Sequence, residues 1–190
     1  MTPKDQIRTW TREVGNAIYI YSTDPSLVDL AALNAALASD TVWWGRGMPE
    51  ESLKRMVEHS YNFGLYVTEK KEGDNEKEQA DKNTKQQQQQ MVGFARLITD
   101  YVTFGYITDV YVLPEYQGKG LGAWMMECLN EVLEQWPELR RAVLFTGDAY
   151  AAKLYERTLG MRDTRENGGK LMVMQRTGPA AATQVGGKKD

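Results

Sequence analysis

Short apolar runs alternate along this chain with segments in which apolar residues recur three or four positions apart. The short runs are bounded by Gly, Pro or Asp, as is typical of strands. They are residues 17–21, 63–68, 92–98, 104–113, 142–146 and 170–175. The spaced segments predict helices with one buried face. They begin near residues 27, 50, 121 and 150. The pattern predicts an α/β (α+β) protein, with a mixed central sheet of about six or seven strands flanked by about four helices.

Residues at three helix ends support this assignment. Asp24 or Ser26 precedes the first spaced segment and can cap its free N–H groups. Pro49 opens the second. Gly160 follows the last and can adopt the left-handed conformation that ends many helices.

Residues 69–90 differ from the rest of the chain because they are charged or polar apart from Gly73 and Ala80, and end in the glutamines 86–90. Such a segment buries too little apolar surface to offset the entropy of ordering it. We expect a disordered insertion between two strands, on which function does not depend; a role in polyglutamine binding is the alternative. Residues 178–190 are expected to form a flexible tail, which leaves a single domain over 1–177.

Composition limits the partners and the compartment. The 190 residues carry a formal net charge of −3 with a pI near 5.4, which gives no reason to expect nucleic acid as a partner. No apolar run reaches the roughly 18 residues of a membrane span, and the charged N-terminus does not resemble a signal peptide. The single cysteine, Cys128, allows no intrachain disulfide and suits the cytoplasm. Its helical neighbours Met125 and Met126 favour a buried apolar role over a nucleophilic one.

A glycine-rich loop, Gln117 to Gly122, joins a predicted strand to a predicted helix. Glycines at 118, 120 and 122 let the backbone approach a ligand closely, and the N–H groups and positive dipole end of the helix favour a phosphate there. Lys119 adds a positive charge. The spacing fits neither a P-loop, which needs Gly-Lys-[Ser/Thr], nor a Rossmann fingerprint, whose third glycine would come one residue later. On spacing alone, a simple connecting turn remains an alternative.

Two longer segments resemble the GCN5-related N-acetyltransferase (GNAT) superfamily. Residues 110–122 match its Arg/Gln-x-x-Gly-x-Gly/Ala motif, which follows a strand ending in Val-x-Pro. Residues 148–161 are similar to its Asn-x-x-Ala-x-x-Leu-Tyr-Glu-x-x-Gly-Phe segment. There Asp148 replaces the common Asn, Met161 replaces the common Phe, and one extra residue precedes Gly160. The order of elements from 17 to 175 also matches.

The resemblance implies a GNAT-like fold and an N-acetyltransferase that uses acetyl-CoA. The acetyl group would pass directly to a primary amine of an undetermined, small acceptor in a ternary complex. The pantetheine arm would lie along the strand at 110–112, and the glycine loop would hold the pyrophosphate. The residues so implied for acetyl-CoA are Val110, Tyr111, Val112, Gln117, Gly118, Lys119, Gly120, Leu121, Gly122 and Asp148.

Catalytic roles follow from the same resemblance and from the chemistry of the step. Tyr155 matches the family's tyrosine that protonates the leaving thiolate; a half-buried packing role is the alternative. A base must take the proton of the attacking amine, and Asp109 on the central strand is our prediction. Other candidates stay open: Asp100, Asp148 and Glu115. His59, the only histidine, is expected to be a solvated surface residue.

The acceptor is expected between the first two helices and beside the sheet. Trp43, Trp44 and Arg46 lie in the loop between those helices and are predicted to bind it, with Phe145 and Tyr106 on the same cleft. Covering of the core by the tryptophans is the alternative. The sequence contains no Cys/His cluster, so no metal site is expected. A non-catalytic acyl-CoA-binding or sensory module is the competing function, and a homodimer is compatible with the sequence.

Overall fold

The computed structural model describes residues 6–69 and 89–164. Most of the polar insertion, the strand expected at 170–175 and the tail at 178–190 lie outside the described residues. The expected single domain over 1–177 therefore stays a prediction.

The described residues form one six-stranded mixed sheet with helices on both faces. The strands follow chain order across the sheet, antiparallel except for the last pair. They are β1 (Thr9–Val14), β2 (Ala17–Ser22), β3 (Tyr61–Glu69), β4 (Gln90–Thr99), β5 (Phe104–Val112) and β6 (Arg141–Val143). The helices are α1 (Leu30–Leu37), α2 (Glu50–Glu58), α3 (Leu121–Leu133) and α4 (Ala149–Leu159), with short 3-10 turns η2 (Pro25–Leu27), η3 (Asp40–Val42) and η4 (Pro114–Tyr116). This arrangement confirms the predicted fold class.

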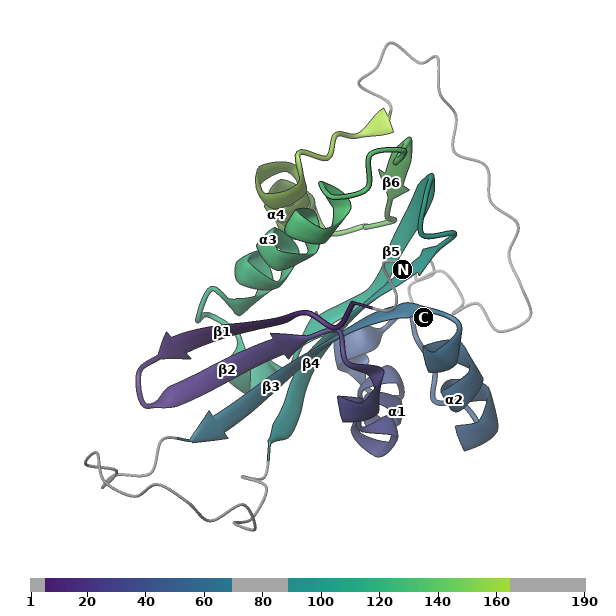
Figure 1. The fold of residues 1–190 in the computed structure, drawn as a ribbon. Coiled ribbons are helices and arrows are strands. Elements are labelled where there is room, and N and C mark those ends of the chain that lie inside the picture. The colour runs from purple at the N-terminus through teal and green to yellow at the C-terminus, as the bar shows by residue number, and fades with distance from the viewer. Residues whose placement is uncertain (1–5, 70–88, 165–190) are drawn as a thin grey trace, which may run out of the picture.

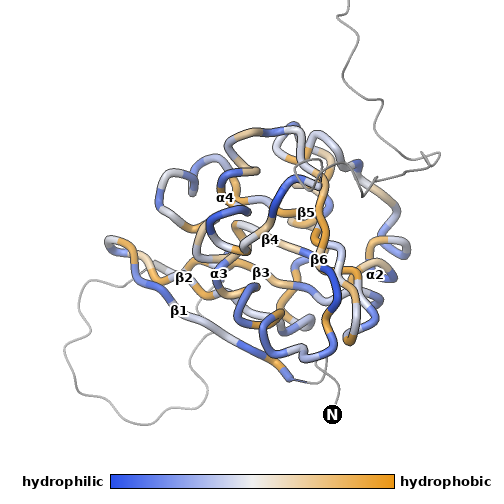
Figure 2. Tube along the Cα trace, turned by 90° about the horizontal axis from the view of Figure 1, so that it is seen from above, coloured by the Kyte–Doolittle hydropathy of each residue, from blue (hydrophilic) through white to orange (hydrophobic). Residues whose placement is uncertain are grey.

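A hydrophobic core lies on each face of the sheet, between the sheet and the helices that cover that face (Figure 1). Helices α3 and α4 cover one face of the sheet, where Phe63, Leu97 and Met125 belong to one buried cluster. Helices α1 and α2 cover the other, where Phe94 and Tyr111 pack beneath them. Figure 2 shows the hydrophobic colour concentrated on central segments such as β5. Strands buried on both faces lose the alternation of an exposed sheet, which explains their continuous apolar runs.

Strand β1 was not predicted; it pairs with β2 from Thr9↔Ser22 to Val14↔Ala17. Most residues of β1 are exposed, so the strand carries little apolar pattern. The available signal was Gly15-Asn16, a two-residue hairpin dipeptide between the two segments.

The first predicted helix is broken into two pieces. Asp24 caps only η2, and α1 begins at Leu30 with Asp29 as its N-cap, whose carboxylate accepts from the N–H of Ala32 at 3.0 Å. Val28 between them is extended, which ends the first turn. The prediction of one helix starting at Asp24 or Ser26 is therefore wrong. Gly160, with φ of 62°, ends α4 as predicted.

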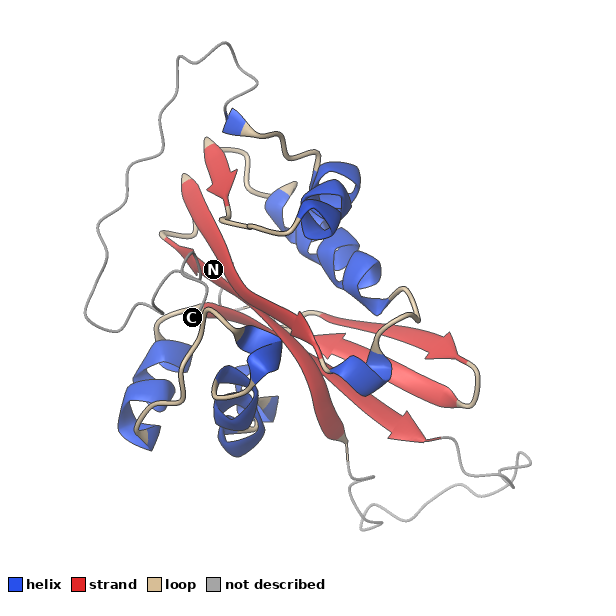
Figure 3. Ribbon diagram, turned by 180° about the vertical axis from the view of Figure 1, so that it is seen from behind, coloured by secondary structure: helices blue, strands red, loops and turns tan. Residues whose placement is uncertain are grey.

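Strand β6 is shorter than the run at 142–146 suggested. It pairs in parallel with β5 only at Phe104–Tyr106 (Figure 3). Within the described residues, no strand pairs with the edge of β5 that faces β6 from Ile107 onward. This open edge determines where the site can lie.

Asp100, one of the candidate bases, forms hydrogen bonds within the turn between β4 and β5. Its carboxylate accepts from the N–H groups of Val102, Thr103 and Phe104 at 3.0, 2.8 and 3.1 Å, and from the Thr103 hydroxyl at 2.7 Å. These bonds, that of the hydroxyl first, lower the pKa of Asp100 well below its ordinary value. A structural role in the turn accounts for all of them.

We therefore predict that Asp100→Ala lowers the melting temperature at pH 7. Because the folded-state pKa is depressed, the stabilisation is present above the unfolded pKa of about 4 and is lost as the pH falls toward the folded value. Calorimetry between about pH 7 and pH 2 should show the difference between wild type and variant shrinking. Asp40→Ala, at an exposed turn residue, is the control for removing a carboxylate. A difference that does not change with pH would contradict the role.

Candidate active site

The glycine loop leaves the start of α3 without a side-chain cap. Gly118 and Gly120 have φ of 77° and 73°, a conformation costly for other residues, and Gly120 is the N-cap of α3. A Cβ built on either glycine meets no atom within 4 Å, so the space in front of the helix is open. The first turn contains no acidic residue. Exposed N–H groups and the dipole of a 13-residue helix thus make a site for an anion.

Lys119 is folded back across the loop. Its ammonium lies 3.4 Å from both the Tyr19 hydroxyl and the Glu115 carbonyl oxygen, and 4.9 Å from the centre of the Tyr116 ring. The residue is exposed, so its charge can turn toward a bound phosphate. Gln117, Gly118 and Gly120 are exposed as well, whereas Leu121, also predicted to bind the cofactor, is buried at 2%.

The open edge of β5 lies next to this loop. Leu113 donates its N–H to Val92 of β4 at 2.8 Å. Because successive N–H groups of a strand alternate between its two edges, those of Val112 and Val110 point away from β4, toward β6. The carbonyl of Val112, on the same edge, accepts from the Gln117 amide at 2.8 Å. The loop and the strand are thus joined, and an extended ligand can pair along Val110 and Val112.

Tyr155 lies on α4, which covers the same face of the sheet as α3 (Figure 1). It is partly buried against the core that Val110 and Leu144 also border. Burial raises the pKa of Tyr155, and the nearby Asp148 carboxylate adds to the effect. The phenol therefore remains protonated at neutral pH and can act as a donor.

The other candidate bases have structural or solvent-facing positions. Asp148 is the N-cap of α4 and accepts from the N–H of Tyr150 at 2.8 Å. Glu115 is exposed in η4, and His59 is exposed at the C-terminal end of α2. The roles predicted for Asp148 at the cofactor and for Glu115 as a base stay predictions.

Asp109 is buried, with 8% of its surface exposed, and lies against Arg96 of β4. The carboxylate oxygen Oδ2 is 2.7 Å from both Nε and Nη2 of the guanidinium. The third guanidinium nitrogen, Nη1, donates to the Ser60 hydroxyl at 3.1 Å. Neither Arg96 nor Ser60 was predicted as a functional residue. The sequence contained one indication of this pair. Two apolar strands that follow one another each contain a charged residue, Arg96 in the first and Asp109 in the second, and the charges are of opposite sign.

Trp43 and Trp44 follow η3 and are exposed, at 57% and 38%. Their rings meet edge to face, with centroids 5.6 Å apart. Val42, just before them, is fully buried in the core that contains Tyr111 of β5, so the pair lies near that strand. Arg46 is exposed in the same loop. The binding role of the two tryptophans, and the alternative that they cover the core, both stay predictions.

Phe145 follows β6 and packs edge to face on Tyr106 of β5, with centroids 5.5 Å apart. Phe145 is 57% exposed. The two rings therefore bridge β5 and β6 near the place where these strands part.

Cys128 is buried, and burial raises the pKa of its thiol to about 12. Such a thiol is not nucleophilic at neutral pH, which agrees with its predicted packing role. Within residues 6–69 and 89–164, no group of three or more His, Cys, Asp or Glu side chains could hold a metal ion. No helix among these residues is both long and apolar enough to cross a membrane.

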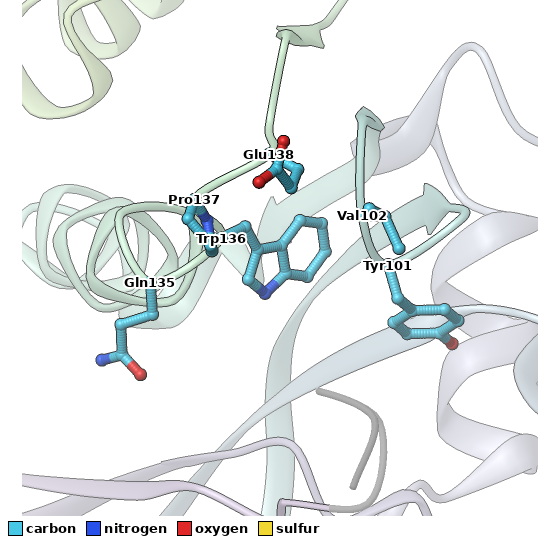
Figure 4. Close-up of a pocket in the computed structure, with 6 residues that line it drawn as sticks. All are labelled: Tyr101, Val102, Gln135, Trp136, Pro137 and Glu138. Carbon is cyan, nitrogen blue, oxygen red and sulfur yellow. The ribbon is translucent and has the colours of Figure 1, made fainter.

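A shallow hollow of about 180 Å³ lies elsewhere, at the C-terminal end of α3 (Figure 4). Its lining residues are Tyr101, Val102, Gln135, Trp136, Pro137 and Glu138. Helix α3 rises about 1.5 Å per residue, so this hollow is on the order of 20 Å from the glycine loop. It is separate from the candidate site.

Comparison with known proteins identifies the family to which the chain is similar. The profile of the Acetyltransferase (GNAT) family matches residues 61–161. A protein of Gibberella zeae, "Putative acetyltransferase FG08082", is 43% identical over 176 residues, which cover 92% of this chain and 95% of the relative.

Solved structures share the fold. A protein of Xanthomonas campestris pv. campestris assigned to the GNAT family is 30% identical, with a TM-score of 0.59 over 87% of this chain and 96% of its own. The Staphylococcus aureus protein SA2161 has a TM-score of 0.52 at 17% identity, covering 90% of this chain and all of its own. At that identity the likeness concerns the fold alone.

Proposed function

Because the chain belongs to the acetyltransferase (GNAT) family, we propose that it transfers the acetyl group of acetyl-CoA to a primary amine of a small acceptor. The chain is an acyltransferase by family. The donor, the acceptor class and the direct attack in a ternary complex are the proposal.

The uncapped start of α3 beside the open edge of β5 carries the proposal. Gly118, Gly120 and the first N–H groups of α3 suit a pyrophosphate, and Lys119 can reach it. The edge at Val110 and Val112 suits an extended amide-containing arm such as pantetheine. Together they match an elongated ligand with a phosphate end and an amide end.

Three tasks then fall to this chain in the chemical step. An N–H group of the β5 edge near Val112 stabilises the oxyanion that forms when the amine attacks the thioester carbonyl. Tyr155 donates its proton to the departing thiolate sulfur as the C–S bond breaks. The amine must arrive neutral, so its proton passes to a base or to water. Such acid–base assistance contributes about 10²–10⁴-fold.

The role of the base is separate from that of Tyr155. Asp109 was predicted for it, but its carboxylate is held by Arg96 within the sheet. The geometry favours a positioning role for Asp109 and leaves the proton to solvent or to a group on the acceptor side.

The acceptor is proposed to bind beside Trp43 and Trp44, whose π faces attract an ammonium group. Arg46 suits a carboxylate on the same molecule, and Phe145 closes the β6 side. A cytoplasmic location is part of the proposal, based on the single cysteine and the need for acetyl-CoA. The homodimer and the alternative of a non-catalytic acyl-CoA-binding module remain open to experiment.

We predict that acetyl-CoA raises the melting temperature of the protein, whereas ATP and NAD at equal concentration do not. At a concentration of 100 Kd, a ligand that binds only the folded state stabilises it by about 2.7 kcal/mol. A thermal-shift series with the three ligands tests the proposed donor. Free-thiol release over a panel of primary amines then tests the proposed transfer to an amine. A shift with no thiol release for any amine would favour the binding module. An equal shift with ATP would contradict the donor assignment.

A further inference from the structure

Strand β5 contains a β-bulge at Asp109. Phe94 of β4 lies opposite Tyr111, but Arg96, two residues later, lies opposite Thr108. One residue of β4, Ala95, therefore faces two of β5, Asp109 and Val110. Such an extra residue bends its strand and changes the direction of the groups that follow.

The backbone at the bulge is strained. Asp109 has φ of 52°, in the left-handed region that glycine adopts freely and other residues rarely do. A conformation of this kind persists only where the surroundings impose it. The surroundings of Asp109 must therefore supply the interactions that hold it.

Arg96 supplies them. Two of its guanidinium nitrogens contact Asp109 Oδ2 at 2.7 Å, and the third donates to Ser60, whose hydroxyl donates to the Met56 carbonyl of α2 at 2.8 Å. The side chains of Arg96 and Asp109 are only 13% and 10% exposed. We name this pair the Arg96–Asp109 clamp. It ties the bulge of β5 to β4 and to the end of α2.

We propose that the Arg96–Asp109 clamp is a positioning device for acetyl transfer: it holds the bulge so that the N–H groups of Val110 and Val112 face the thioester. The inference rests on the proposed function, since it assumes acetyl-CoA along that edge. It assigns Asp109 a task without proton transfer, because the carboxylate is engaged across the sheet. Arg96 then matters as much as Asp109, although it lies one strand away from the reacting atoms.

Two double variants separate positioning from base catalysis. Arg96→Met/Asp109→Gly and Arg96→Met/Asp109→Ala both remove the carboxylate and leave no buried charge unpaired. Only glycine adopts the bulge conformation without strain. We expect the glycine variant to retain kcat within about tenfold of wild type, and the alanine variant to fall to about a hundredth of wild type, since a misplacement near 1 Å can cost that much. Both should keep the wild-type pH profile and an acetyl-CoA Kd within about threefold, because the pyrophosphate loop is untouched.

A single substitution tests the inference if the double variants fail to fold. Arg96→Lys keeps the charge but loses the two-nitrogen contact, and should lower kcat about tenfold with little change in acetyl-CoA Kd. Arg8→Lys, at a partly buried arginine whose guanidinium donates to the Gln135 side chain, is the matched control and should leave kcat unchanged. Equal loss in the glycine and alanine variants, with the acidic limb of the pH profile gone, would make Asp109 the base. Wild-type turnover in the alanine variant or in Arg96→Lys would also overturn the inference.

A readout without turnover keeps this test separate from the proposed function. If no amine supports thiol release by the wild type, the proposed function fails. The clamp is then judged from the ¹⁵N–¹H shifts of Val110 and Val112, which should move in Arg96→Lys and stay in place in Arg8→Lys. Unmoved shifts in Arg96→Lys would show that the clamp does not set the strand.

Discussion

Replacing Gly120 by aspartate is expected to weaken acetyl-CoA binding about a hundredfold or more. Gly120 is the N-cap of α3, and a Cβ there projects into open space where the pyrophosphate is proposed to lie. At 5 Å and an effective dielectric constant of 20, two like charges repel by about 3 kcal/mol, which is about a hundredfold in Kd. Titration calorimetry with acetyl-CoA measures the effect directly.

Gly120→Ala is the matched control for this prediction. Both variants place a side chain at φ of 73°, which lowers stability by up to about 1–2 kcal/mol and by less for aspartate than for alanine. Only aspartate adds the charge, so the difference in Kd between them isolates the repulsion, and it should shrink at high salt. Equal affinities of the two variants would place the phosphates elsewhere, even if both bind more weakly than wild type.

Much of the fold was predictable because buried strands and amphipathic helices leave periodic patterns. The wrong predictions of secondary structure share a cause. Where a segment buries few residues, capping and turn residues determine its structure more than the pattern of apolar positions does. Exposed β1 was missed despite its Gly15-Asn16 turn, and Asp29 rather than Asp24 starts α1. Neither error moves the site, because the strand and helix that frame it, β5 and α3, are well buried.

The residues of the candidate site also differ in whether the sequence could predict them. The glycine loop is contiguous in sequence, so its glycines could be recognised with no knowledge of the fold. The Arg96–Asp109 clamp is not contiguous: it depends on the register of β4 against β5 and on a bulge, which no spacing in the sequence reveals. The same register gives Asp109 an interaction partner that an isolated aspartate in a strand pattern does not show.

The largest loss of turnover is expected from Tyr155→Phe. The phenol is proposed to protonate the leaving thiolate, and removing such an acid lowers kcat by about 10²–10⁴-fold. The ring stays, so its packing on the core and the acetyl-CoA Kd should change little. Thiol release at saturating acetyl-CoA, together with the Kd from calorimetry, separates the two quantities.

Tyr150→Phe provides the control, because Tyr150 lies on the same helix and is 82% exposed. The pH dependence gives a second test. Since burial raises the pKa of Tyr155, its protonated form persists above the ordinary value of about 10, so kcat of the wild type should show no alkaline decline below that pH. If Tyr155→Phe turns over as fast as Tyr150→Phe, the thiolate takes its proton from another donor and Tyr155 serves the fold alone. If instead kcat falls while Kd holds, the hydroxyl acts in the step itself, since packing and binding are both preserved.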